Sequence, residues 1–242
     1  MSYGYFTYNN LKSVDFGLYI DPNFSFSSPS IAGEFVKIPN KDGEVFLTDR
    51  SLKNVSRSFP VYFLPRNNEN IVQQTTDISN WLKTDIGWKE LTFSGDPEYL
   101  YSAIYTDEYE VDKNIESFSK SILTFTIKPY KYLKDSLDPI EVTNGQYLTN
   151  KGTRPSKPLL RVEGTGDITV KFGSNQLRLK GIDQGIIVDL QAQVVTSLDG
   201  SRPAYDRVYT YPFPVFSVGR HRVTWSGNAT KVEITPRWEV VV

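Results

Sequence analysis

The residues that could carry chemistry are carboxylates, one histidine and a glycine-rich turn, and none falls in a catalytic pattern. The pair Asp107 and Glu108 has the residue types of a glycoside hydrolase, but a chain with 28 acidic residues contains such pairs by chance. His221 has no G-x-S-x-G or comparable nucleophile motif to serve. The turn Gly164-Thr-Gly166 precedes neither a helix nor a Lys-Ser/Thr pair, so it is not a phosphate loop. The sequence therefore predicts a protein that is not an enzyme.

Metal and cofactor sites are equally unsupported. Asp183, Asp189, Asp199 and Asp206 lie at separate turns without the D-x-D-x-D spacing of a calcium loop, which indicates solvated turn residues. The absence of cysteine excludes thiolate sites, and one histidine leaves little scope for zinc. A net charge of −1, from 27 basic and 28 acidic residues, gives no footprint for specific nucleic-acid binding. We expect no metal and no cofactor.

Export and membrane insertion are also not indicated. No apolar run approaches the roughly 18 to 20 residues of a membrane span. The N-terminal run Met-Ser-Tyr-Gly-Tyr-Phe lacks the basic region and apolar stretch of a signal peptide. We therefore expect synthesis in a cytoplasm, without Sec export and without a membrane partner.

Aromatic residues make up 14% of the chain, a composition that suits strands, protein interfaces and sugar-binding surfaces. One cluster falls in a proline-containing loop, where a binding role and simple packing are about equally favoured. We take it as the candidate binding surface of the C-terminal domain: Tyr209, Tyr211, Phe213 and Phe216.

The N-terminal half is predicted to be mostly β with one helix. Residues 123–127 alternate apolar and polar side chains, and Pro129 then ends that strand. Apolar residues at helical spacing predict a helix near 70–84, with Ile71, Thr75, Ile78 and Leu82 on its buried face and Asn67 or Asn68 as N-cap. Strands at 35–38 and 45–47 flank Asn40-Lys-Asp-Gly43, a hairpin signal.

The C-terminal half shows short strands at intervals of roughly 8 to 12 residues, typical of an antiparallel β-sandwich or jelly roll. Turns are expected at 164–166, 173–175, 199–200 and 226–228. The sequence therefore predicts two domains, with residues 1–132 forming a mostly β domain with one helix and residues 139–242 an antiparallel sandwich or jelly roll. Residues 133–138 are the expected linker.

Short motifs in a fixed order carry a family resemblance. They are Phe6-x-Tyr8-Asn9 with Ser13-x-Asp15-Phe16-Gly17-Leu18; Trp81-Leu82 with Leu91-Thr-Phe93, Asp96-Pro97 and Tyr101-x-Ala103; Phe125-x-x-x-Pro129-Tyr130; and Asn150-x-Gly152, Pro158, Gly164-x-Gly166-Asp167, Ile187-Val-Asp189-Leu190 and Gly219…Thr224-Trp225-Ser-Gly227. Together they span almost the whole chain, which resembles the distal tail (Dit) proteins of siphophages, the phages with long non-contractile tails. The family often has Asn-Gly in the first turn, where this chain has Asn9-Asn10.

The resemblance implies a structural hub of the phage tail tip or baseplate, and hence a virion protein. It implies that residues 1–132 form a β-barrel-like domain with one helix and residues 139–242 a galectin-like or jelly-roll sandwich. It also implies a homo-hexameric ring, built by the N-terminal domain, through which DNA passes without specific binding. The partners implied are the major tail tube protein, a tail-associated lysin or fibre protein, and in some phages baseplate or receptor-binding proteins. Within this picture the hairpin is our candidate for the subunit interface, through Lys37, Asp42, Gly43, Glu44, Val45 and Leu47. An ordinary hairpin inside the barrel is an equally open interpretation.

The competing function is a carbohydrate-binding β-sandwich protein, because galectin-like sandwiches often bind sugars. A small enzyme is a distant third. Assembly state separates the first two, since a hub should be a hexamer and its isolated C-terminal domain should not bind glycans.

Limited proteolysis tests the domain boundary. Residues 131–138 are polar and show little periodicity, so a protease should cut there first and release a stable fragment that starts between Asp135 and Thr143. Mass spectrometry of the fragments reads the site. Cleavage confined to other segments, or no cleavage in a protein shown to be monomeric, would contradict the boundary.

Overall fold

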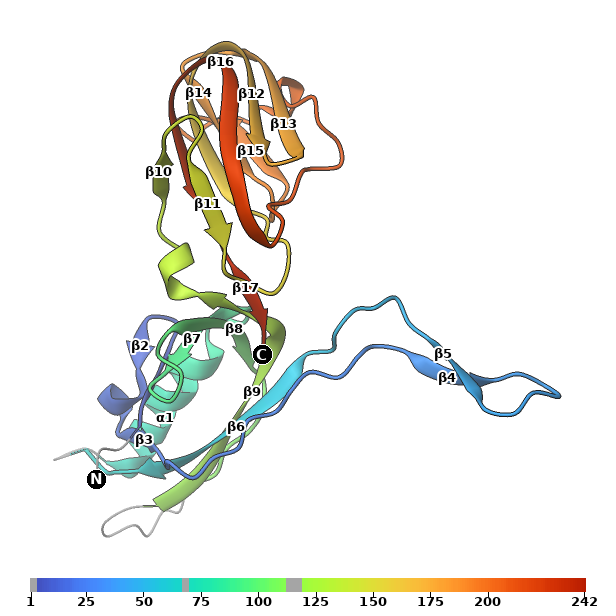
Figure 1. Ribbon diagram of the computed structural model, residues 1–242. Coiled ribbons are helices and arrows are strands. Elements are labelled where there is room, and N and C mark those ends of the chain that lie inside the picture. The colour runs from blue at the N-terminus through green and yellow to red at the C-terminus, as the bar shows by residue number, and fades with distance from the viewer. Residues whose placement is uncertain (1–3, 67–69, 112–118) are drawn as a thin grey trace. The chain divides into compact units, whose positions relative to one another are not determined.

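The computed structural model describes residues 4–66, 70–111 and 119–242 (Figure 1). The chain forms two compact units, residues 1–131 with Val241–Val242, and Tyr132–Val240. The last two residues thus return to the first unit, where the Val242 N–H donates to the Pro129 carbonyl at 3.1 Å. The fold is mainly β, as predicted, with the single described α-helix in the first unit. The expected domain limits 1–132, 133–138 and 139–242 stay a prediction for proteolysis.

The first unit is built on a strongly curved antiparallel sheet with the strand order β2-β1-β7-β8-β9-β6-β3. A bridge between Gly4 and Ile20, with the Ile20 N–H donating to the Gly4 carbonyl at 2.8 Å, joins β3 to the residues just before β1. The sheet therefore closes on itself, as expected for a barrel-like domain. Its strands are β1 (Phe6–Tyr8), β2 (Leu11–Lys12), β3 (Leu18–Ile20), β6 (Val55–Phe63), β7 (Lys89–Phe93), β8 (Tyr99–Tyr105) and β9 (Ser119–Leu133); β17 (Glu239–Val241) follows at the C-terminus.

The interior of this barrel is filled mainly by aromatic rings. Strand β6 alternates buried and outward residues along its length, so that every second side chain enters the core. Phe6 stacks on Phe59 at 5.7 Å and on Trp81 of the helix at 5.6 Å between ring centroids. The aromatic content noted in the sequence is thus largely core packing in this unit.

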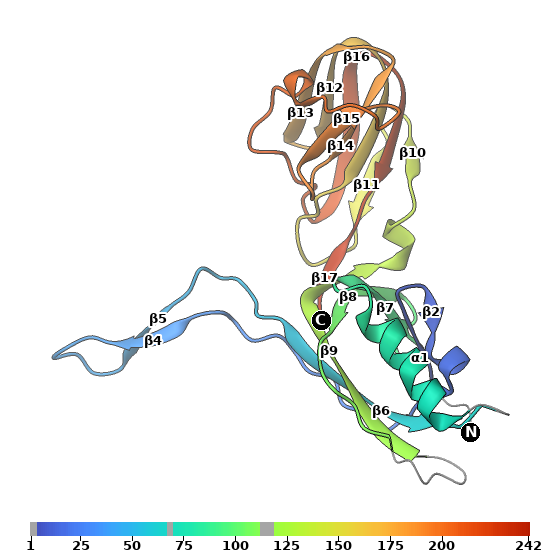
Figure 2. The ribbon, with the colours of Figure 1, turned by 180° about the vertical axis from the view of Figure 1, so that it is seen from behind.

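Helix α1 (Ile71–Lys83) covers the barrel and is held by specific polar contacts (Figure 2). Asn70 is the N-cap, and its side chain accepts from the Val72 N–H at 2.9 Å; the predicted caps Asn67 and Asn68 lie outside the described residues. Gln74, rather than the predicted Thr75, is the buried residue of the first turns. Its amide donates to the Phe16 and Leu64 carbonyls, both at 3.0 Å.

Trp81 connects the helix to the sheet through a ring contact and a hydrogen bond. Its ring stacks on Phe16 at 4.3 Å, and its indole N–H donates to the Tyr8 carbonyl at 3.0 Å. Phe16 comes from the short 3₁₀ turn η1 (Ser13–Phe16). The indole is therefore satisfied while fully packed, as buried tryptophan requires.

The second unit is a sandwich made from one folded sheet, because its two longest strands run through both layers. One layer contains β10, β14, β15 and one half each of β12 and β16; the other contains β11, β13 and the remaining halves. A single apolar core lies between them. The elements are β10 (Ile140–Val142), β11 (Tyr147–Asn150), β12 (Leu159–Phe172), β13 (Asn175–Ile182), β14 (Gly185–Asp189), β15 (Val194–Ser197) and β16 (Gly219–Thr235), with 3₁₀ turns η2 (Lys134–Ser136) and η3 (Tyr205–Arg207).

Two predicted turns are wrong. Residues 164–166 and 226–228 are bends inside β12 and β16, which stay paired there with shifted register. Gly227 has a φ of +93°, and a Cβ at this position would lie 2.0 Å from the Asp167 carbonyl oxygen. Only glycine fits this close approach. The glycines that the sequence analysis assigned to turns are therefore bends within β12 and β16, at which both strands pass from one layer to the other.

Truncation of the helix face tests this packing. Leu82 is buried under the sheet, so Leu82→Ala should lower the free energy of unfolding by about 2–5 kcal/mol. Thermal and urea unfolding measure the change. Ile86, which is 82% exposed just beyond the helix, is the matched control, and Ile86→Ala should leave stability within error. Equal effects of the two changes would show that the helix face is wrongly placed.

Candidate interaction surface

The feature of the first unit that its own core does not explain is a hairpin outside the barrel sheet. Strands β4 (Glu34–Lys37) and β5 (Glu44–Leu47) pair only with each other among the described strands, as the separate ribbon in Figures 1 and 2 shows. An antiparallel bridge between Ile31 and Leu52 continues the pairing toward the barrel. We call residues 31–52 the arm.

The Asp-Gly signal in the sequence correctly located the turn of the arm. Asn40 and Gly43 have φ angles of +59° and +81°, the left-handed conformations that asparagine and glycine tolerate best. The Lys41 N–H donates to the Ile38 carbonyl at 3.3 Å. The hairpin prediction is therefore confirmed, although the hairpin is not part of the barrel sheet.

Both faces of the arm are exposed and carry apolar side chains, with Glu34 at the edge of one face and the Lys37–Glu44 pair at the edge of the other. All eight residues of β4 and β5 are solvent-exposed, and Phe35 reaches 67%. Directly opposed residues share a face of the ribbon, so Phe35 lies with Phe46, at 4.8 Å between ring centroids, and Val36 with Val45 on the other side. A two-stranded ribbon is at best marginally stable alone in water, and its outer edges carry unpaired backbone groups. The arm has the properties of a surface that another polypeptide covers.

The base of the arm is nevertheless well defined. The Thr48 hydroxyl donates to the Ala32 carbonyl at 2.5 Å, and the Ala32 N–H donates to the Ser51 carbonyl at 2.8 Å. Gly33 packs so closely that a Cβ there would lie 2.5 Å from the Leu47 carbonyl oxygen. These contacts make the arm an ordered ribbon in the structure of a single chain.

All six residues predicted for the interface lie on the arm: Lys37, Asp42, Gly43, Glu44, Val45 and Leu47. The sequence reasoning missed Phe35 and Phe46, the largest side chains of the ribbon. The run Glu34-Phe35-Val36-Lys37 places one apolar residue on each face of the strand, so neither face is wholly polar, and this feature could have singled them out.

The candidate surface in the second unit is not brought together in the same way. Tyr211 is 93% exposed, and Tyr209 is also exposed beneath the Lys180 ammonium, which lies 4.4 Å from its ring centroid. Phe213 is half-buried. Phe216 is 0% exposed and packs against Trp238 at 5.0 Å, so it belongs to the sandwich core and cannot contribute to an exposed surface.

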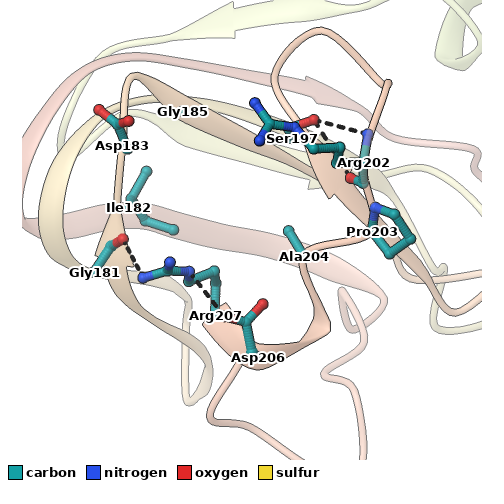
Figure 3. Close-up of a pocket in the computed structure, with 10 residues that line it drawn as sticks. All are labelled: Gly181, Ile182, Asp183, Gly185, Ser197, Arg202, Pro203, Ala204, Asp206 and Arg207. Carbon is teal, nitrogen blue, oxygen red and sulfur yellow. Dashed lines mark hydrogen bonds and ion pairs between the residues drawn. The ribbon is translucent and has the colours of Figure 1, made fainter.

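A polar cavity of about 320 Å³ lies between η3 and the β13–β14 turn (Figure 3). Arg207 spans it, with Nη1 donating to the Gly181 carbonyl at 2.7 Å and Nε 3.1 Å from the Asp206 carboxylate. Pro203 and Ala204 form an apolar wall. The residues that line this cavity include no aromatic ring on which a sugar could stack, and Arg207 is already engaged by the protein.

Three of the four aspartates considered for calcium are engaged by other groups of the protein, and the fourth, Asp183, lines the polar cavity. The pKa of Asp199 lies below its ordinary value because the Ser197 and Ser201 hydroxyls donate to it. The Asp206 carboxylate forms an ion pair with Arg207. The Asp189 carboxylate forms an ion pair with Arg237, with 2.8 Å between Oδ1 and Nη1. Within residues 4–66, 70–111 and 119–242, no three metal-ligating side chains gather.

Comparison with known proteins identifies the family. Residues 6–127 match the family model described as the phage tail protein RIFT-related domain, Sipho_tail. The chain belongs to this family of phage tail proteins. The match covers the barrel unit and includes the arm, so a phage tail protein is confirmed for the half of the chain on which the sequence prediction placed ring formation.

Solved structures show the same fold over nearly the whole chain. A crystal structure of Dit (gp 19.1) from phage SPP1 is 17% identical, with a TM-score of 0.73 over 96% of this chain and 98% of that one; it is described as a hub of the adsorption apparatus in phages that infect Gram-positive bacteria. Two structures of the phage p2 baseplate in its activated conformation, with Ca and with Sr, have TM-scores of 0.54 at 11% and 10% identity. They cover 97% and 96% of this chain and 98% of theirs. The prediction of a distal-tail-type fold is confirmed.

These relatives are structural components of tails and baseplates, in agreement with a non-enzymatic phage tail protein that forms part of the virion. No curated protein matches the chain. In the described part of the chain, no helix has the length and apolar character needed to cross a membrane.

The Asp189–Arg237 pair makes a pH-dependent prediction. Burial raises the pKa of Asp189, but donation from Arg237 and from the Ala192 and Gln191 N–H groups outweighs it, and the folded-state pKa lies below the ordinary value. The contribution to stability is therefore complete above the unfolded pKa of about 3.9 and is lost as pH falls through the folded pKa.

Asp189→Asn should thus lower the free energy of unfolding by about 1–2 kcal/mol at pH 7, and this deficit should shrink below about pH 4. Urea unfolding at pH 7, 5 and 3 measures it. Asp206→Asn, which removes the exposed pair with Arg207, is the control and should have no measurable effect. A deficit for Asp189→Asn that is the same at pH 3 as at pH 7 would contradict the pairing.

Proposed function

We propose that the chain is the hub of a phage tail tip, a structural subunit that assembles into a homo-hexameric ring. The observation that carries this proposal is the arm, an ordered ribbon with apolar side chains on both faces and no partner strand among the described residues of its own chain. Membership of the phage tail family and the shared fold with the SPP1 hub support it.

A ring requires a heterologous interface, in which one patch meets a different patch on the next subunit. The arm supplies one such patch. Its outer edges can add strands to a neighbouring sheet through backbone hydrogen bonds, while its phenylalanine face buries apolar area. The six residues from Lys37 to Leu47 predicted from the sequence, together with Phe35 and Phe46, form this surface.

The ring joins the major tail tube protein on one side to a tail-associated lysin or fibre protein on the other, with baseplate or receptor-binding proteins as further partners. The chain has a net charge of −1 and so lacks the excess of basic residues of a nucleic-acid-binding protein. We therefore expect DNA to pass through the channel without specific binding. The second unit carries no assembly role in this proposal. The descriptions of the SPP1 hub and the p2 baseplate support this placement at the tail tip.

A carbohydrate-binding sandwich is the alternative, and the exposure of Tyr209 and Tyr211 favours it. The burial of Phe216 and the aromatic-free polar cavity weaken it.

Size-exclusion chromatography with light scattering tests the proposal. The full chain should have six times the mass of the 27.6 kDa subunit, and the double variant Phe35→Ser, Phe46→Ser should be monomeric with an unchanged fold by circular dichroism. The control Val72→Ser, Ile86→Ser removes two exposed apolar side chains away from the arm and should stay hexameric.

A full chain that is monomeric at high concentration, even with its tail tube partner present, would overturn the hub proposal and favour the sugar-binding alternative. Hexamers that persist in the double arm variant would show that a different surface builds the ring.

A further inference from the structure

Arg57 is the most unusual residue of the barrel, because it places a cation in an aromatic core. It lies on the inward side of β6, between Val55 and Phe59, and is 1% exposed. Its Nε and Nη1 atoms are buried and have no hydrogen-bond partner. Fully buried arginine is normally paired, since an uncompensated buried charge is strongly destabilising. The fold therefore holds two guanidinium donors in position for a group that residues 4–66, 70–111 and 119–242 do not provide.

The charges near Arg57 do not balance it. Asp96 is the carboxylate that acts on Arg57 electrostatically, but it already accepts hydrogen bonds from the Tyr101 hydroxyl and from Lys131, the latter at 2.5 Å. Arg57 and Lys131 thus share a single carboxylate. The cluster has one positive charge in excess, and its missing member is an anion.

The cover over Arg57 is light. The ring of Phe26 lies on the guanidinium, 4.8 Å from ring centroid to Cζ, and Phe93 lies 5.9 Å away. Phe26 is 61% exposed, in a segment without regular structure. From Phe24 to Pro29 the structure shows no backbone–backbone hydrogen bond, so this ring can move aside without breaking a ladder.

The arm offers a matching group. Asp42 lies in the exposed turn of the arm and has no hydrogen bond or ion pair in the described structure. It cannot serve its own Arg57 while the arm stays paired, because the ten residues from Asp42 to Leu52 span about 33 Å as an extended strand fixed at the Ile31–Leu52 bridge. The donor and the acceptor can therefore meet only between two copies.

We propose that Arg57 is a binding site for the arm of a second copy of this chain, whose Asp42 carboxylate enters as Phe26 moves aside and accepts a hydrogen bond from the guanidinium. A hydrogen bond between two charged groups is shorter and about twice as strong as one between neutral groups. The proposal rests on ring assembly as the function. It assigns the acceptor site for the arm, and it makes Arg57 a residue that costs stability in the free subunit and is satisfied on assembly.

The test separates subunit stability from assembly. Arg57→Met replaces the guanidinium by an apolar side chain of similar reach. In the monomeric background Phe35→Ser, Phe46→Ser it should raise the melting temperature by about 2 °C or more, because it removes an unpaired buried charge. In the otherwise unchanged chain it should raise the concentration at half-assembly by about 30-fold or more, as loss of a buried charge pair does. Mass photometry over a dilution series measures the second quantity.

Asp42→Asn should weaken assembly to a similar degree, and the double variant Arg57→Met, Asp42→Asn should be little worse than either single variant, since both remove one contact. Asp107→Asn is the matched control for loss of one exposed carboxylate and should assemble normally. Hexamers of Arg57→Met with unchanged affinity, or additive effects of the two single variants, would overturn the site even if the wild-type chain is a hexamer. A wild-type chain that never assembles would instead refute the proposed function, and a lower melting temperature of Arg57→Met in the monomeric background would refute the uncompensated charge.

Discussion

The main constraint on this protein is that a β-ribbon with apolar side chains on both faces needs a cover. The barrel meets the same constraint internally, since the Gly4–Ile20 bridge closes its sheet and turns Phe6, Phe59 and their neighbours inward. The arm leaves Phe35 and its opposite partner in solvent and keeps its outer edges free. The closed barrel therefore supplies the stability of the first unit, while the arm leaves apolar side chains and free strand edges exposed for the proposed interface.

Arg57 is a second group, this time in the core of the barrel, that lacks a hydrogen-bond partner among the described residues. Natural cores avoid unpaired cations, and the single carboxylate nearby is shared with Lys131. A free subunit that is less stable than it could be, at a site covered only by the ring of Phe26, is consistent with a protein selected for its assembled state. In the second unit, hinge glycines fold a single sheet around one apolar interior.

Much of this structure could be predicted from the sequence, and the predictions that were wrong share one physical cause. Local signals located the Asp-Gly hairpin and the face of α1, because turn chemistry and helical spacing act over a few residues. They failed for β12 and β16, where Gly227 marks a bend and not a reversal, since only pairing between distant strands distinguishes the two. Burial of Phe216 was not predictable for the same reason, because a loop aromatic reads as a surface residue until long-range packing encloses it. Arg57 differs, since it shares the strand face of Val55 and Phe59 and the alternation alone could have indicated its burial.

Amide hydrogen exchange along the arm tests the central claim most directly. In the isolated, monomeric subunit, the peptides that cover residues 34–37 and 44–47 should exchange rapidly, because a two-stranded ribbon opens readily. In assembled particles the same peptides should become protected, while the surface of the second unit around Tyr211 should not change. Arm peptides that exchange equally fast in the monomer and in the particle would contradict the account, because they would show that no neighbour covers the ribbon.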